Sequence, residues 1–296
     1  MGGLRARRER CVQAGMKTVG ISGAGHYNGL VCTYARKRED SARHMSKDLT
    51  PILEGWDYDR ARTTVRKIMG LDGRGKIQMR LQLGVLQMEA TGRPDGRRPH
   101  GCESLLEHFE RTLEEMRSDG REEQFELRAA DCAELRDEAL QYYYRYVSLF
   151  SLEEYADAAR DTQRNLRAFD LVKKHAVTDA DKFSLEQHRP YVIMMNSRAR
   201  ANLAIRHDDL KAAYDVLHEG MDLVRSFFLE YGQPGLAEKS DEYKMLSKQA
   251  DELKDRVPRD PLHVLRDKLR VAVEKENFEE AARLRNKIQK LEQTGT

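Results

Sequence analysis

The sequence predicts a mainly α-helical protein, and three observations lead to this expectation. From Ser104 onward, apolar residues recur at intervals of three and four, with charged residues on the opposite face, as is typical of amphipathic helices. Hydrophobic residues make up 40% and charged residues 34% of the chain, a balance typical of soluble helical proteins. Only seven prolines interrupt it, so disorder throughout is not expected.

Composition and pattern divide the chain into four segments. At 296 residues it is long enough for one large or two modest domains. We expect an N-terminal extension that does not fold, a small irregular region with Gly/Asp turns, a helical body and a C-terminal helical hairpin. Their boundaries are 1–44, 45–102, 103–257 and 258–296.

Residues 1–44 differ from the rest of the chain. They contain nine Lys or Arg against three Asp or Glu, with scattered glycines and no helical or strand period, so we expect them not to fold. Because an ordered-looking sequence begins directly after Met45, we expect translation to start there. A basic arm that binds nucleic acid is the alternative.

The remaining composition argues against several classes of protein. The formal charge is +2, yet residues 45–296 carry 43 basic and 47 acidic side chains, a net charge of −4. Such a body lacks the broad basic face that nucleic-acid binding requires. No apolar run approaches the roughly 18 residues of a membrane span, and we expect a cytoplasmic protein. The cysteines form no CxxC pair for a zinc ribbon; they are Cys11, Cys32, Cys102 and Cys132.

The region 51–101 is irregular, with turn signals in GLDGRGK and GRPDGRRPHG. Between these turns lies IQMRLQLGVLQME. Its apolar residues alternate as in a strand from Ile77 to Leu83, but they also fit a helical face from Ile77 to Met88. We predict a helix here because no partner strand stands out nearby.

The helical body, 103–257, carries an internal echo. Pro190 starts or kinks one helix, and Asp208 is expected to cap the next one. At an offset of 55 residues, two triplets correspond: Tyr155, Ala158 and Leu166 match Leu210, Ala213 and Met221. The segment ANLAIRHDDLKAAYDVLHEG resembles a tetratricopeptide repeat (TPR), and it predicts antiparallel helical hairpins. Because that family repeats about every 34 residues and the offset here is 55, we call these hairpins TPR-like only.

The C-terminal segment predicts a tight helical hairpin. Asp260 suits the N-cap of a helix and Pro261 its first position. Asn277, with Glu280 three residues later, forms an Asn-type capping box that starts a second helix, and Phe278 is expected to cover the end of the seam between the helices. Spacings of three, four and three line up one seam from each helix: Leu262, Leu265, Leu269 and Ala272, then Ala281, Leu284, Ile288 and Leu291.

This arrangement resembles the UVR motif, and ENFEEAARLRNKI is similar to that motif's core. The motif occurs in the UvrB and UvrC excision-repair proteins, in ClpC-type unfoldases and in McsA-type kinase activators, where it implies docking between hairpins. The sequence contains none of the companion domains of those proteins, so the resemblance implies docking alone. The docking residues that it implies are Leu262, Leu265, Leu269, Phe278, Ala281, Ala282, Leu284, Arg285, Ile288 and Leu291.

The sequence gives only weak support for a nucleotide-binding, metal-binding or catalytic site. The run from Gly70 to Lys76 satisfies GxxxxGK, but Ile77 stands where a P-loop needs Ser or Thr for magnesium. Histidines are scattered without metal-ligand spacing, and no Ser or Cys sits in a nucleophile elbow. We therefore expect no catalytic residue, no cofactor and no metal.

Two further groups could bind ligands. Arg93, Arg97 and Arg98 flank a glycine turn and form a candidate anion site, with a solvated loop as the alternative reading. Four tyrosines could line a peptide groove: Tyr142, Tyr143, Tyr144 and Tyr146. Consecutive helical residues face different directions, so only some of them can share a site, and core packing is the alternative.

We predict a non-catalytic adaptor that docks another protein through the hairpin. The partner could carry a UVR hairpin of its own, and self-association through the hairpin is one form of this. The alternative is a DNA-repair accessory that binds nucleic acid or excision-repair components. The partner's identity and the cellular process are not readable from the residues.

Overall fold

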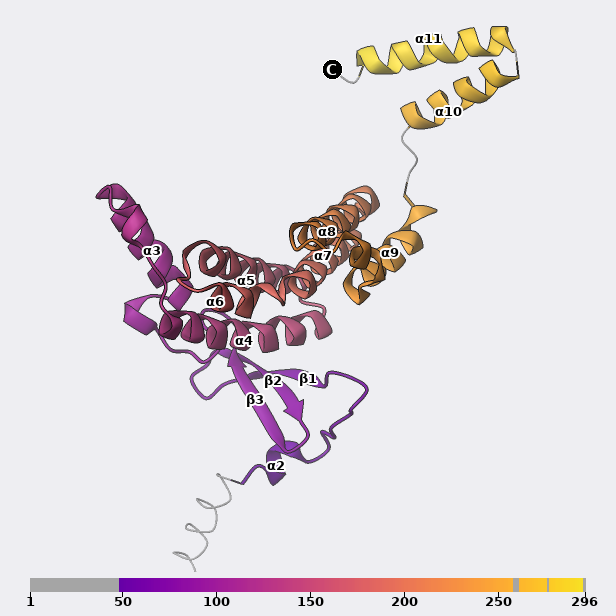
Figure 1. The fold of residues 1–296 in the computed structure, drawn as a ribbon. Helices are drawn as coiled ribbons and strands as arrows, with labels where there is room; N and C mark the ends of the chain where they lie inside the picture. Colours follow the sequence, from indigo (N-terminus) through magenta and orange to yellow (C-terminus); the bar gives the residue numbers. More distant parts are fainter. Residues whose placement is uncertain (1–47, 258–260, 276, 295–296) are drawn as a thin grey trace, which may run out of the picture. The chain divides into compact units, whose positions relative to one another are not determined.

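The computed structural model describes residues 48–257, 261–275 and 277–294. The expectations for residues 1–44, including the start at Met45 and the basic arm, lie outside these ranges. A short helix, α2 (Thr50–Leu53), belongs to a first unit, Met1–Gly55. The second unit, Trp56–Thr296, holds the remaining elements (Figure 1). They are β1 (Val65–Met69), β2 (Gly75–Leu81), β3 (Gly84–Glu89), α3 (Leu105–Ser118), α4 (Ala129–Ser151), α5 (Tyr155–His175), α6 (Asp179–Glu186), α7 (Arg189–Arg206), α8 (Leu210–Glu230), α9 (Asp241–Lys254), α10 (Pro261–Glu274) and α11 (Phe278–Thr294), with 3₁₀ turns at Pro99–Gly101, Glu122–Gln124 and Pro234–Lys239.

The three strands form an antiparallel sheet in the order β1–β2–β3. The helix predicted across residues 77–88 is therefore wrong. Ile77 pairs with Met88 on one side and with Lys67 on the other, so β2 has a partner along both edges. The strand alternation from Ile77 to Leu83 was the correct pattern up to the turn between β2 and β3, where Leu83 is 93% exposed. The helix was predicted because no partner strand stood out, and β1 and β3 are those partners.

The sheet packs on the helical body through α4 (Figure 1). Ile77, Met79 and Met88 are buried in the same core cluster as Tyr146 and Leu149 of α4. The alternation of Ile77 and Met79 along β2 puts both side chains on one face of the sheet. Burial of this face explains why the segment keeps a strand register despite its charged neighbours.

A buried ion pair fixes the end of β3 to the body. Arg145 of α4 donates to both carboxylate oxygens of Asp161 on α5, at 2.6 and 2.9 Å, and both side chains are 1% exposed. The same guanidinium donates to the backbone carbonyls of Glu89 and Gly92, at 3.1 and 2.7 Å. Because the charges are buried together, removal of either one leaves the other uncompensated.

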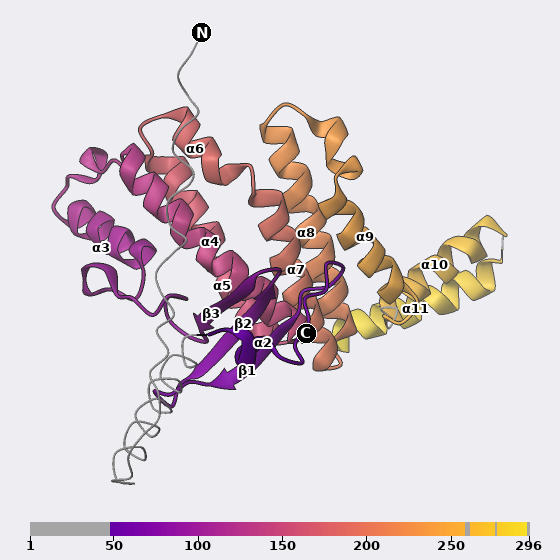
Figure 2. The same cartoon turned by 90° about the horizontal axis from the view of Figure 1, so that it is seen from below.

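The body continues as a series of packed helices. The helix α4 packs on α5, α5 on α7, α7 on α8 and α8 on α9, and Figure 2 shows α7, α8 and α9 side by side. Short connections join α4 to α5 and α7 to α8, which makes each pair antiparallel.

The 55-residue echo of the sequence recurs in these two pairs. Ala158 and Ala213 are both fully buried. The turns between the helices are alike: Glu153 and Asp208 both take a left-handed conformation, with φ of 60° and 58°. In each turn the next residue donates to a carbonyl five residues earlier, Glu154 to Leu149 at 2.8 Å and Asp209 to Ala204 at 3.0 Å. These bonds are those of a Schellman motif.

The cap of α8 differs from the expectation. Asp208 does not cap it; Asp209 does, since its Oδ1 accepts from the N–H of Ala212 at 2.9 Å. Asp208 instead provides the left-handed residue of the turn, a position that Asp tolerates better than most residues. Pro190 lies in the first turn of α7, which agrees with its predicted role as a helix start.

The described cysteines serve packing. Cys102 and Cys132 are buried free thiols, and burial raises the pKa of the Cys132 thiol to about 11. A thiol with so high a pKa is poorly reactive. Within the described ranges, no helix combines the length and apolar character needed to cross a membrane, and no cluster of His, Cys, Asp or Glu could hold a metal ion.

Candidate docking site

The C-terminal helices α10 and α11 pack against each other and enclose a small apolar core. This core contains the described residues of the seam predicted from the three-and-four spacing, among which Leu269 is partly buried. Its buried members are Leu265, Ala272, Ala281, Leu284 and Ile288. Two of the five are alanines, so the helices approach closely and the apolar volume between them is small.

The bend between the helices is built by Asn277. Its Oδ1 accepts from the N–H of Glu280 at 3.3 Å, which is the predicted cap of the second helix. The N–H of Asn277 donates to the carbonyl of Ala272 at 2.8 Å and so ties the bend to the end of α10. Glu279 and Glu280 stand in the first turn of α11, where carboxylates interact favourably with the helix dipole.

Phe278 does not cover the end of the seam, and that prediction is wrong. Its side chain is 71% exposed. The Asn277–Ala272 hydrogen bond closes the bend, and the core residues nearest to it in the sequence are Ala272 and Ala281. Phe278 is left on the surface.

The predicted docking residues divide into two groups. Leu265, Ala281, Leu284 and Ile288 are buried inside the hairpin, where a partner cannot reach them while the hairpin is closed. By contrast, Phe278, Ala282 and Arg285 are exposed, and their spacing of four and three places them along one face of α11. Leu262 and Leu291 lie within α10 and α11, but their side chains are outside the described residues.

The exposed surface of the hairpin is partly apolar. Val271 and Val273 on α10 are 39% and 49% exposed, and neither was predicted as a docking residue. Their signal was present in the sequence, since both are apolar residues outside the seam of an amphipathic helix. With Phe278 they give the hairpin apolar side chains that its own core does not use, as interaction surfaces do.

Comparison with known families and proteins bears on this hairpin alone. Residues 260–294 match the family described as the UvrB/uvrC motif. The match covers α10 and α11 and leaves the TPR-like reading of 103–257 as a prediction. The chain matches no curated protein and no solved structure. The UVR motif mediates protein–protein interactions, and this hairpin is where the chain carries it.

The three arginines of the candidate anion site do not share one environment. Arg93 is mostly buried, and its Nε lies 3.0 Å from the fully buried Glu138 carboxylate; a second ion pair joins it to Asp95 at 3.5 Å. Arg97 and Arg98 are exposed on the same loop. The structure thus gives Arg93 acidic partners within the protein, and anion binding by Arg97 and Arg98 stays a prediction.

The GxxxxGK sequence forms the turn between β1 and β2. Gly70 donates to the carbonyl of Arg74 at 2.8 Å, and Gly73, with φ of 72°, donates to that of Gly70 at 3.0 Å. Lys76 forms ion pairs with Asp72, at 2.8 Å, and with Glu89. These contacts hold the pKa of the Asp72 carboxyl well below its usual range, mainly through its hydrogen bond with Lys76.

The tyrosines of α4 face different directions, as helical geometry requires. Tyr142 and Tyr146 are buried, and burial raises the pKa of both phenols. Tyr143 is partly exposed and lines, together with Tyr146 and with Tyr191 of α7, a cavity of about 580 Å³. The predicted groove therefore keeps two tyrosines, while Tyr142 packs within the body.

Proposed function

We propose that this protein is a non-catalytic adaptor that docks another protein through its UVR hairpin. The observation that carries the proposal is the match to the UvrB/uvrC motif at 260–294, on a hairpin with a closed core and exposed apolar residues. The docking surface is the exposed face of α11 formed by Phe278, Ala282 and Arg285, and Val271 and Val273 add exposed apolar side chains on the two sides of the buried Ala272 of α10. The seam residues support it from inside.

The charges along the hairpin support a partner of the same kind. Residues 274–280, at the bend, hold four glutamates and one lysine, whereas residues 283–290 hold four basic residues and no acid. Two such hairpins placed antiparallel bring the acidic bend of each against the basic stretch of the other. Complementary charge of this sort sets orientation and speeds association. A second copy of this chain is the simplest partner with that pattern.

Affinity capture from native cells tests the proposal with the tagged full chain. Phe278→Ser removes an exposed apolar side chain without touching the core, so we expect loss of captured partners with unchanged helical content. Gln289→Ser is the matched control, because Gln289 is also exposed on α11 but carries no charge and is not in the docking surface. Sedimentation velocity of the same variants shows whether a second copy is among the partners. Equal capture by wild type and Phe278→Ser contradicts the proposed surface.

We also propose that the body between 103 and 257 is a TPR-like scaffold for a partner. Support comes from the repeated hairpins α4–α5 and α7–α8, with their matching left-handed turns and buried alanines. The two hairpins touch through Arg206, which forms an ion pair with Glu153 at 2.6 Å and lies over the ring of Tyr155. Stacking of successive hairpins is how helical repeats build a continuous core.

We propose further that the GxxxxGK turn binds no ATP. Lys76 is 7% exposed and is paired with two carboxylates, and a strand follows it where a P-loop requires a helix. Saturable, magnesium-dependent ATP binding that is lost in Lys76→Ala would contradict this.

A further inference from the structure

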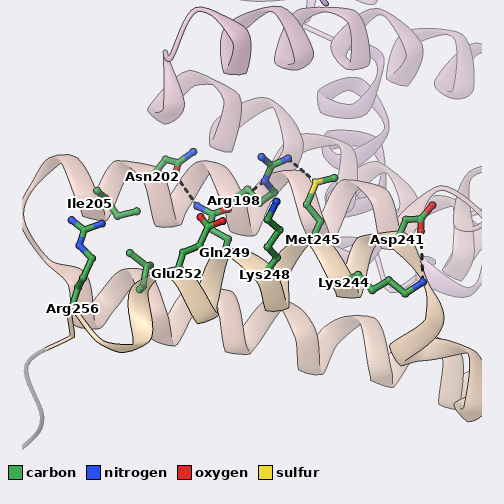
Figure 3. A pocket seen from close by; sticks show the side chains of 11 residues that line it. Arg198, Asn202, Ile205, Asp241, Lys244, Met245, Lys248, Gln249, Glu252 and Arg256 are labelled. Atoms are coloured by element: carbon green, nitrogen blue, oxygen red, sulfur yellow. Dashed lines mark hydrogen bonds and ion pairs between the residues drawn. The ribbon is translucent and has the colours of Figure 1, made fainter. Parts of the chain in front are cut away.

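A second candidate site lies in the body, in a groove between α7 and α9. Its volume is about 770 Å³, and side chains from the two helices project toward one another across it (Figure 3). Four basic residues contribute to its lining, Arg198, Lys244, Lys248 and Arg256, against two acidic ones, Asp241 and Glu252. Lys244 and Asp241 form an ion pair with each other at 3.9 Å.

Arg198 is a partly buried cation that contacts neutral groups. Its Nε donates to Gln249 at 3.3 Å, its Nη1 approaches the sulfur of Met245 at 2.9 Å, and its guanidinium lies 5.0 Å from the ring centre of Phe150. Within the described residues, no carboxylate forms an ion pair with it. Burial lowers the pKa of Arg198, the direction expected when a cation loses water.

Other buried or partly buried arginines of the body form ion pairs with carboxylates. Arg145 binds Asp161, Arg164 binds Glu138, and Arg189 binds Glu186 at 2.8 Å. Since a desolvated charge without a counter-ion is costly, Arg198 is the position in this set where an external anion would gain most.

The hydrogen bonds from Arg198 through Gln249 to Asn202 form a row in which each residue donates to the next. A guanidinium can only donate, so the carbonyl of the Gln249 amide faces Arg198 and its NH₂ group faces Asn202. That NH₂ donates to the Oδ1 of Asn202 at 2.8 Å, which leaves the NH₂ of Asn202 as the donor at the end of the row. The floor of the groove thus offers donors, and a ligand that satisfies them must bring acceptors.

We propose that this groove binds an acidic polypeptide segment of a partner protein, with a carboxylate seated on Arg198 beside Lys248. Apolar surface from Ile205, Met245 and Leu253 accompanies the donors, and it suits side chains placed between the carboxylates of a peptide. Asp241 and Glu252 stand in the same lining, so a peptide whose carboxylates are separated by neutral side chains fits it better than the uniformly charged backbone of a nucleic acid. This site is separate from the hairpin and does not rest on the docking proposed for it.

Fluorescence anisotropy with the full-length protein tests the proposal. The probe is a fluorescent peptide of glutamate, leucine and serine, and its counterpart has glutamine in place of glutamate. We expect saturable binding of the acidic peptide, with roughly tenfold or greater weakening in Arg198→Gln, because charge-assisted hydrogen bonds are lost. Lys248→Gln, at an exposed position, should weaken binding by a smaller factor. Circular dichroism of both variants verifies folding.

The matched control is Arg200→Gln. Arg200 lies on the same helix and pairs with Glu219 at 3.1 Å, outside the groove, so its loss should leave peptide binding unchanged. Phe278→Ser should also leave it unchanged, which separates this site from the hairpin. The proposal is overturned by equal binding of the glutamine peptide, by no saturable binding of the acidic peptide, or by unchanged binding in both groove variants. Tighter binding of a single-stranded oligonucleotide that depends on Arg198 would overturn it in favour of nucleic acid.

Discussion

The helical body and the UVR hairpin are both made of antiparallel helices, but they hold those helices together differently. The body combines a large apolar core with buried charges, such as Arg145 with Asp161. Its Glu138 carboxylate, fully buried, accepts from the N–H groups of Leu105 and Leu106 at 2.8 and 3.2 Å and so fixes the start of α3. The hairpin has a few aliphatic side chains and an exposed ion pair, Arg283 with Glu279.

The comparison indicates that the two regions differ in the free energy that each can lose before it unfolds. A buried, fully bonded polar network specifies one arrangement of a core and is intolerant of single changes. A two-helix unit with a small core has little free energy of its own to lose. We therefore expect the body to unfold as one unit, and the hairpin to open without it.

The largest effect is expected for Asp161→Leu, which leaves Arg145 as an unpaired buried charge. Breaking such a pair costs about 3–5 kcal/mol, and the body should lose that much of its free energy of unfolding in urea titration followed by circular dichroism. The control is Asp222→Leu, which breaks the exposed Asp222–Arg225 pair and should cost less than about 1 kcal/mol. Similar midpoints for the two variants would show that the buried pair does not stabilise the body.

Leu284→Asp should open the hairpin alone. A carboxylate at this seam position is either buried without a partner, at a cost of several kcal/mol, or forces the helices apart. Hydrogen exchange should then become fast in α10 and α11 while α4 to α9 keep their protection. Lys287→Asp places the same carboxylate at an exposed position of α11 and should leave exchange slow. If α4 to α9 also lose protection, the hairpin is instead a structural cap on the end of the helical body.

A smaller effect is expected for Gly220→Ala in α8. A Cβ at this position would lie 2.3 Å from the hydroxyl oxygen of Ser197 and 3.1 Å from Leu246, so overpacking should cost about 1–3 kcal/mol. The gain in helix propensity, about 1 kcal/mol, offsets part of this. Gly235→Ala, with open space around the new atom, should be neutral, and Ser197→Gly combined with Gly220→Ala should recover stability.

The smallest effect concerns pH. Burial, as the main cause, lowers the pKa of both His108 and His175 below the usual value of 6.5. The unfolded chain therefore binds protons at a higher pH than the folded body does, so stability should fall as pH drops from 6.5 toward the lowered folded values. Thermal melts across this range should show the decline. The double variant His108→Gln, His175→Gln should flatten it.

Periodicity predicted what depends on local pattern and missed what depends on distant partners. The seam of the hairpin and the 55-residue echo followed from residue spacing, because each helix brings its own apolar face to its neighbour in the chain. The sheet was missed because the pairing of Lys67 with Ile77 joins a strand of charged character to an ambiguous one. The local residue pattern does not show that Val65–Met69 pairs with residues 75–79.

The binding surfaces show the same limit. Spacing located Leu284 and Ile288 on the seam, but it does not distinguish a seam closed by the hairpin itself from one open to a partner. The position of Phe278 depended on the Asn277–Ala272 hydrogen bond, a detail of the bend. The α7–α9 groove joins Arg198 to Gln249, 51 residues apart, and the sequence gives no sign of that contact.

The central claim is that partners dock on the exposed face of the UVR hairpin, and site-specific photo-crosslinking in cells tests it most directly. A benzoylphenylalanine is placed in the full-length protein at Phe278 or, as a control, at Phe183 of the body, which is 49% exposed. We predict a discrete protein adduct from position 278 that disappears when Leu284→Asp is added. Absence of an adduct at 278, or one that persists after the hairpin has been opened, would contradict the claim.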